Sequence, residues 1–121
     1  MQLQLLDDRF CVCKIDGVSQ VDFQSDFFFL AKTDFEVSLV CKEKDAPKAS
    51  MAMDKYWRAL RIAGILDFSL VGILSDISSV LANAGVPIFA VSTYDTDYIL
   101  IREEYLDKAL NALKESKYTL L

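Results

Sequence analysis

Residues 66–101 read LDFSLVGILSDISSVLANAGVPIFAVSTYDTDYILI and predict one amphipathic helix followed by a β-hairpin. Apolar residues recur every three or four positions over 70–84, as one buried face of a helix requires. Gly85 then stands where a glycine commonly ends a helix, and Pro87 prevents the helix from continuing. The expected elements are a helix over 69–84 and strands over 86–93 and 98–102.

Similar patterns flank this passage in the second half of the chain. A strand pattern covers residues 57–65, a second helix pattern covers 103–115, and residues 118–121 form a last short strand. The order is βαββαβ, which is the ferredoxin-like order of an antiparallel sheet with two helices on one face. The sequence therefore predicts the α+β fold class.

The first half of the chain contains strand patterns over 9–15, 27–31 and 37–42, followed by a short helix or coil over 51–56. FFLAKTDFEVSLVCKE (28–43) aligns without a gap on IFAVSTYDTDYILIRE (88–103) at an offset of 60. We interpret residues 1–56 as a truncated copy of the unit in 57–121, lacking most of its first helix. Two unrelated hairpins remain the alternative.

Composition limits the classes of partner. The chain has 121 residues, 53% of them hydrophobic, with a formal net charge of −5. An acidic surface repels phosphate backbones, so we expect no nucleic acid. No run of 18 apolar residues is present, and acids occupy the N-terminus where a signal peptide needs bases, so we expect no membrane and a cytoplasmic location.

The chain lacks the residues that several kinds of catalysis require. The chain contains no histidine, which removes His-based triads and dyads and most transition-metal sites. Its four glycines are too dispersed for a phosphate-binding loop or a dinucleotide fingerprint. We expect a protein that is not an enzyme and carries no cofactor.

The three cysteines are Cys11, Cys13 and Cys41. Cys11 and Cys13 alternate on a predicted strand and share one face. A metal site is conceivable, but no histidine or second cysteine pair follows at ligand spacing. We therefore expect buried structural cysteines and no metal.

Two polar segments, 67–72 and 92–97, contain features that folding of the turns alone does not explain. The first leads into the predicted helix, whose N-terminal N–H groups can bind a carboxylate. In the second, Asp95 and Asp97 can pair with an ammonium or guanidinium group. Together these features describe an amino-acid ligand. Each also has a simpler reading: Asp67 as a helix cap, Gly72 as a packing contact, and the acids as turn formers.

The sequence of 66–101 resembles the ACT domain family of small regulatory modules that bind amino acids. The pattern is an acid, a glycine, an apolar helix, AGVPIF, and then STYDTDYIL. It is most similar to bacterial tandem-ACT proteins that also resemble the CASTOR-type arginine sensors. FFFLAKTDFEVSLVC resembles the hairpin of the leading ACT unit in that branch.

The resemblance implies a non-catalytic sensor, a homodimer with its ligand at an interface, and a ligand site in two parts. The implied site residues are Asp67, Ser69, Leu70, Val71, Gly72, Ile73, Thr93, Tyr94, Thr96 and Asp97. Asp97 would bind a cationic group, Gly72 and its neighbours a carboxylate, and Tyr94 would form a stacking wall. A structural dimerisation module without a ligand is the alternative, and a small enzyme is a third reading.

Overall fold

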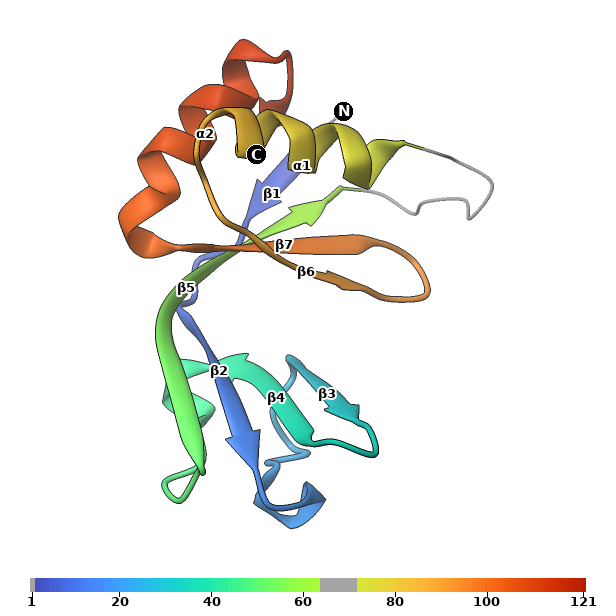
Figure 1. Cartoon of the computed structure of the whole chain (residues 1–121), viewed down its shortest axis with the longest axis vertical. Coiled ribbons are helices and arrows are strands. Elements are labelled where there is room, and N and C mark those ends of the chain that lie inside the picture. Colours follow the sequence, from blue (N-terminus) through green and yellow to red (C-terminus); the bar gives the residue numbers. More distant parts are fainter. Residues whose placement is uncertain (1, 64–71) are drawn as a thin grey trace. The chain divides into compact units, whose positions relative to one another are not determined.

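The computed structural model of the protein describes residues 2–63 and 72–121 (Figure 1). The chain folds into two compact units. The larger consists of Met1–Asp7 and Arg58–Leu121, and the smaller of Asp8–Trp57. Of the helices that the structure describes, none has both the length and the apolar character needed to cross a membrane.

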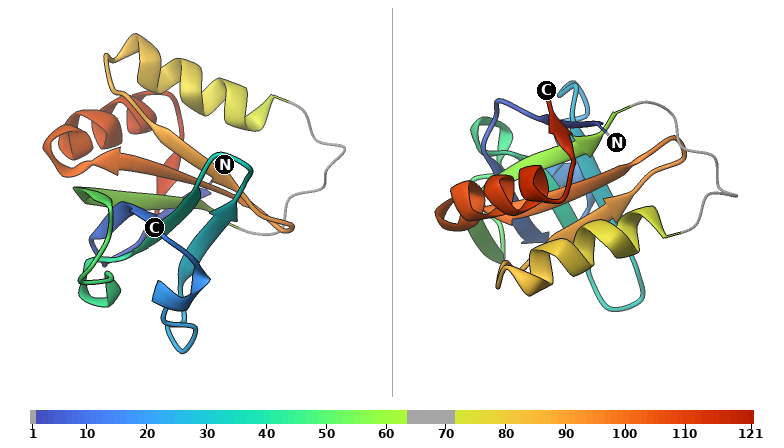
Figure 2. Two further views of the ribbon diagram at one scale, coloured as in Figure 1. Left: turned by 60° about the horizontal axis from the view of Figure 1, so that its bottom comes forward. Right: turned by 90° about the horizontal axis from the view of Figure 1, so that it is seen from above.

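In its described residues, the larger unit is a sheet with two helices on one face. Its strand order is β6-β7-β5-β1-β8, and α1 and α2 lie side by side over the sheet (Figures 1 and 2). The predicted order βαββαβ and the α+β class are thus confirmed. The elements are β1 (Gln2–Leu5), β5 (Ala52–Ile62), α1 (Ile73–Asn83), β6 (Phe89–Ser92), β7 (Asp97–Arg102), α2 (Leu106–Glu115) and β8 (Thr119–Leu120).

The core of this unit lies between the helices and the sheet. α1 contributes Ile77 and Leu81, which stand four residues apart and are fully buried, as the sequence pattern predicts. The other core residues come from the sheet, from α2 and from the segment after α1: Leu3, Leu60, Ile62, Val86, Ile99, Ile101, Ala109 and Leu113. Burial of this apolar surface is the main force that holds the helices on the sheet.

The end of α1 also agrees with the sequence. Gly85 has a φ of 75°, a left-handed conformation that favours glycine. Its N–H donates to the carbonyl of Ala82, and the N–H of Val86 donates to the carbonyl of Leu81, both at 2.9 Å. This is the Schellman pattern of a helix C-terminus, and it turns the chain into β6.

The smaller unit is an antiparallel sheet in the order β3-β4-β2-β5. Its strands are β2 (Phe10–Ile15), β3 (Phe28–Lys32), β4 (Val37–Lys42) and the first half of β5, with short 3-10 turns η1 (Val18–Gln20) and η2 (Glu43–Asp45). The three cysteines are buried in its core and free, as expected.

The two hairpins share one geometry. Lys32 pairs with Val37 at the end of the β3–β4 hairpin, and Ser92 pairs with Asp97 at the end of β6–β7, an offset of 60 in both strands. A threonine closes each turn, because the N–H of Thr33 donates to Glu36 at 2.9 Å and that of Thr93 to Thr96 at 2.8 Å. A 3-10 turn follows each second strand, η2 in one case and η3 (Glu103–Tyr105) in the other.

The structure differs from the sequence-based expectations at two strands. β1 was not expected, and β5 begins at Ala52, where a short helix or coil was expected. The start of β5 does not alternate in burial, and its pairing with β2 shifts register near Tyr56, which has a φ of 75°. Such a bulge hides the period-two pattern of a strand. β1 also pairs in parallel with β8, so the sheet is mixed and not wholly antiparallel.

Candidate functional site

The first part of the predicted site lies at the N-terminus of α1. Asp67, Ser69, Leu70 and Val71 lie outside the described residues. Gly72 is the N-cap of α1 and has a φ of 84°, and Ile73 is the first residue of the helix. Because glycine has no side chain, the cap residue itself covers none of the N–H groups of the first turn, which carry partial positive charge.

The second part is the turn between β6 and β7. The hydroxyl of Thr93 donates to the carbonyl of Thr96 at 3.0 Å and accepts from the Thr96 N–H at 3.4 Å. Tyr94, at the tip, exposes 82% of its surface. The turn is therefore ordered by threonine side chains, where most hairpins rely on glycine or asparagine.

Thr96 connects this turn to β5. Its hydroxyl donates to the carbonyl of Ile62 at 2.9 Å, and the residue is only 8% exposed. Ile62 is the last residue of β5, the strand from which the chain continues toward α1. The structure thus brings Thr93, Thr96 and Asp97 to the end of β5, where the resemblance also places the first part of the site.

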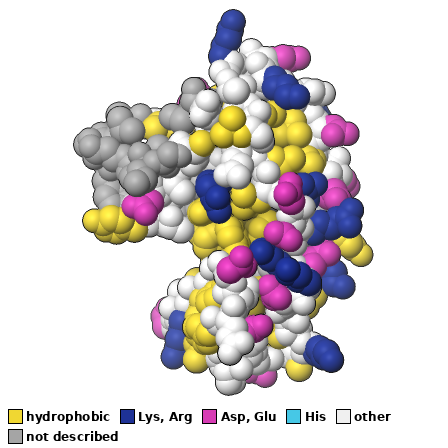
Figure 3. All heavy atoms as spheres, turned by 180° about the vertical axis from the view of Figure 1, so that it is seen from behind, with side chains coloured by type: hydrophobic (Ala, Val, Ile, Leu, Met, Phe, Trp, Pro, Cys, Tyr) yellow, Lys and Arg dark blue, Asp and Glu magenta, His cyan; other side chains and the backbone are white. Residues whose placement is uncertain are grey.

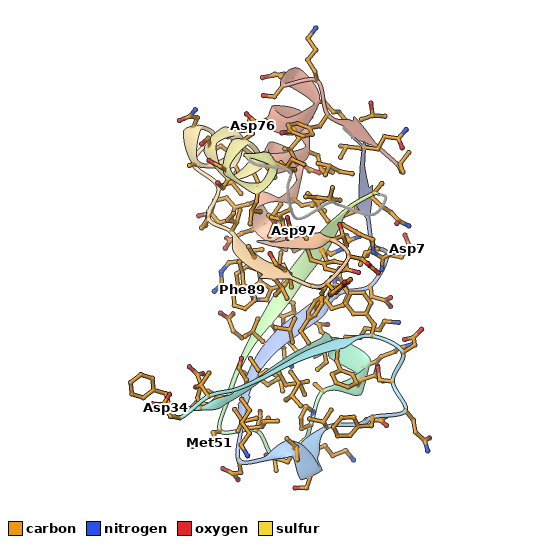
Figure 4. The ribbon with its side chains drawn as sticks, turned by 90° about the vertical axis from the view of Figure 1, so that its right-hand side faces the viewer. Asp7, Asp34, Met51, Asp76, Phe89 and Asp97 are labelled. Carbon is orange, nitrogen blue, oxygen red and sulfur yellow. The ribbon has the colours of Figure 1, made fainter. Side chains whose placement is uncertain are left out.

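Asp97 is the acid of the predicted site that lies among the described residues. It is half-buried at the first residue of β7, whereas Asp34 marks the tip of the other hairpin (Figure 4). Among residues 2–63 and 72–121, none forms a hydrogen bond or an ion pair with its carboxylate. A half-buried carboxylate in this state is suited to binding a cationic group.

Sequence reasoning missed the interactions of one cation, Arg61, on the sheet. Arg61 Nε donates to the Tyr98 hydroxyl at 3.1 Å, and Arg61 Nη1 donates to Gln4 Oε1 at 3.3 Å. The guanidinium carbon also lies 5.2 Å from the centre of the Tyr98 ring. Arg61 stands between the core residues Leu60 and Ile62 along β5. This alternation was the signal in the sequence that Arg61 lies on the face of the sheet opposite the core. Its partners could not be found without the pairing of β5 with β1, which carries Gln4, and with β7, which carries Tyr98.

Asp76, in the first turn of α1, already has a partner. The Tyr118 hydroxyl donates a hydrogen bond to its carboxylate. Burial, together with this bond and the nearby negative charge, raises the pKa of Tyr118 to about 12. This acid therefore stabilises the contact between the C-terminal segment and α1, and we do not assign it to the ligand.

The Tyr118 contact predicts weaker stability at high pH. The pKa of the folded protein is about 12 and that of an unfolded tyrosine about 10, so above pH 10 the folded state keeps a proton that the unfolded state releases. This contribution is complete below pH 10 and is lost as the pH rises toward 12. Urea unfolding followed by circular dichroism at pH 9 and pH 11 should show the decrease, and Tyr118→Phe should make it shallower. Equal pH dependence in both proteins would contradict the assignment.

Charged side chains are mixed on the surface. Among the described residues on the face shown in Figure 3, Lys and Arg side chains are interspersed with Asp and Glu. This arrangement is unlike the continuous basic stripe with which proteins bind a phosphate backbone.

Comparison with solved structures supports the fold. Protein Atu0741 from Agobacterium tumefaciens is 28% identical, with a TM-score of 0.86 over 99% of this chain and 91% of that chain. VC0802 from Vibrio cholerae, a protein of unknown function, is 18% identical, with a TM-score of 0.74 over 92% and 85%. The regulatory subunit of aspartate kinase from Thermus thermophilus is 14% identical, with a TM-score of 0.67 over 95% and 96%.

The sequence itself matches a family model. The model of the ACT domain covers residues 52–115, more than half of the chain, and includes both α-helices that the structure describes. ACT domains are commonly regulatory, non-catalytic modules that bind ligands. The chain belongs to the ACT domain family.

Proposed function

We propose that this protein is a regulatory module that binds an amino acid where the β6–β7 turn adjoins the end of β5. The observation that carries the proposal is the hydrogen bond from Thr96 to the Ile62 carbonyl. It holds the ordered turn, and with it Asp97, at the strand from which the chain leads to α1. A carboxylate-binding helix terminus and a cation-binding acid are the two elements that recognition of an amino acid requires.

In this proposal each part of the site has one role. The N–H groups at Gly72 and Ile73 bind the ligand carboxylate, while Asp97 binds its cationic group. Tyr94 packs against the ligand at the open side. Thr93 and Thr96 hold the turn in place, and Asp67, Ser69, Leu70 and Val71 supply further contacts with the ligand.

We also propose that the ligand is a cationic amino acid, as in the CASTOR-type sensors that the sequence resembles. Asp97 supports this, because a half-buried carboxylate favours a cation that can replace its lost hydration. The shared register of the two hairpins supports the interpretation of the first half as a shortened ACT copy. We place the module in the cytoplasm as a homodimer, and its free thiols suit a reducing compartment.

A thermal-shift screen with the twenty amino acids at millimolar concentration tests the proposal. At a hundred times its Kd, a ligand stabilises the folded state by about 2.7 kcal/mol. For a chain of this size the melting temperature should rise by on the order of 10 °C. We expect the rise with lysine or arginine. No shift with any amino acid would favour a structural dimerisation module.

Two matched variants locate the site. Asp97→Asn and Asp95→Asn each remove one negative charge from the same turn, but Asp97 is half-buried and Asp95 is exposed. We expect Asp97→Asn to lose the shift and Asp95→Asn to retain it. If both variants retain full affinity for the ligand, Asp97 does not contact the ligand.

A further inference from the structure

Three cysteine sulfur atoms meet in the core of the smaller unit. Cys11 Sγ lies 3.6 Å from Cys13 Sγ and 3.7 Å from Cys41 Sγ, and all three sulfur atoms lie within 4.8 Å of one another. Cys11 and Cys13 share one face of β2, and Cys41 is directly opposite Cys11 on β4. The sequence could not reveal this cluster, because Cys41 joins it only through the pairing of β2 with β4.

These spacings are those of ligands around one metal ion. With metal–sulfur bonds of ~2.3 Å, two sulfur ligands are ~3.8 Å apart in a tetrahedral site and ~4 Å apart in a trigonal one. With separations of 3.6 and 3.7 Å and a limit of 4.8 Å for the third pair, the two shorter pairs need shifts of only a few tenths of an ångström.

We propose that Cys11, Cys13 and Cys41 form a thiolate site for a soft metal ion, and that Cu(I) is the ion it fits best. Three sulfur ligands without histidine select soft ions. Structural zinc sites, in contrast, are almost always four-coordinate. A three-sulfur set is thus better suited to Cu(I) than to zinc.

A cavity borders the buried cluster at Cys11. Its volume is about 760 Å³, and Cys11 and Met53 are among the residues that line it. Met53 also pairs with Cys13 across β2 and β5, and its side chain packs against the cysteine core. Met53 is thus a sulfur-containing side chain packed against the core that holds the three thiols.

Charge around the cavity favours a negatively charged metal centre. Binding converts three thiols and one Cu⁺ into a tris-thiolate copper centre of charge −2 and releases three protons. Burial and the neighbouring Cys11 raise the pKa of Cys13 to about 12, so the metal must displace its proton. Lys44, Lys48 and Lys55 line the cavity together with one acid, Glu43, so the lining has a net positive charge that offsets the charge of the metal centre.

Competition for copper tests the site in the full chain. Cu(I) is added as its acetonitrile complex to reduced protein without oxygen, in the presence of the coloured chelator bicinchoninate. We expect the protein to withdraw one Cu(I) per chain from the chelator. Cys11→Ala, Cys13→Ala and Cys41→Ala should each lower the affinity at least ~100-fold, since even outer-shell partners of metal ligands account for 10–100-fold.

Val12→Ala is the matched control. Val12 lies between Cys11 and Cys13 on β2, so its side chain points to the opposite face. The change shortens an apolar side chain of the same strand and leaves all three sulfur atoms in place. We expect the copper affinity of this variant to equal that of the unchanged protein.

A second measurement needs no variant and so does not depend on the folding of the cysteine substitutions. X-ray absorption of the copper-loaded protein should show sulfur neighbours at ~2.3 Å. Oxygen or nitrogen neighbours, or failure to withdraw copper, would overturn the proposal. A mass 2 Da lower in the protein as purified, read by mass spectrometry, would also overturn it, because Cys11 and Cys41 would then form a disulfide. Asp97→Asn should bind copper normally, which separates this inference from the amino-acid site.

Discussion

Replacing Leu3 with aspartate is expected to unfold the larger unit. Leu3 is fully buried in the core between sheet and helices, and its strand, β1, lies between β5 and β8. An unpaired carboxylate at this position loses its hydration and is destabilising by several kcal/mol, in addition to the lost apolar contacts. Since domains are stable by only about 5–15 kcal/mol, a loss above about 5 kcal/mol removes most of the folded population.

Circular dichroism at 222 nm measures this effect, because α1 and α2 both belong to the larger unit. Gln2→Asp is the control, since it places the same charge on the same strand at an exposed position. We expect the control to keep its helical signal and its urea midpoint. If Leu3→Asp unfolds at the same urea concentration as the unchanged protein, β1 does not hold the sheet together.

Shortening Leu81 to alanine is expected to lower the free energy of unfolding by about 3 kcal/mol, within the range of 2–5 kcal/mol for buried leucine. Leu81 is fully buried on α1, and its side chain lies in the core with Ile77 and Ala109. The change removes apolar contacts and leaves a cavity that closely packed neighbours fill only in part.

Ser79→Ala, on the exposed side of the same helix, is the control for Leu81→Ala. Its effect should be within about 0.5 kcal/mol, as for most surface positions. Urea unfolding of both variants gives the comparison. A loss below about 1 kcal/mol for Leu81→Ala would mean that α1 does not pack on the sheet through this face.

Sequence reasoning found the elements whose pattern is local. The helix with Ile77 and Leu81 on one face, the glycine that ends it and the strands of both hairpins follow from the spacing of apolar residues. The sequence pattern did not predict β1, because four residues are too few to show a period. This segment becomes a strand only by pairing with β5 and β8. Tertiary pairing, rather than local preference, decides such segments.

The candidate site, like the fold, could be predicted from the sequence only in part. The composition of the turn drew attention to Asp97, and the structure adds that Thr96 is buried and holds the turn against Ile62. Neither the interaction of Arg61 with Tyr98 nor the meeting of Cys41 with Cys11 follows from spacing. Both join residues more than 25 positions apart, and only the register of the strands brings them together.

The position of β1 has a consequence for how the chain is made. Leu3 pairs with Ile62 and Gln2 with Thr119, so these pairs join residues about 60 and about 120 positions apart. Contacts between such distant positions slow folding, because a long loop must close before they form. During synthesis on a ribosome, β8 emerges after all the other strands that the structure describes, and β1 must wait for it with one edge unpaired. This edge can bind other strands, so we expect aggregation of nascent chains to be greatest in the interval before β8 pairs with β1.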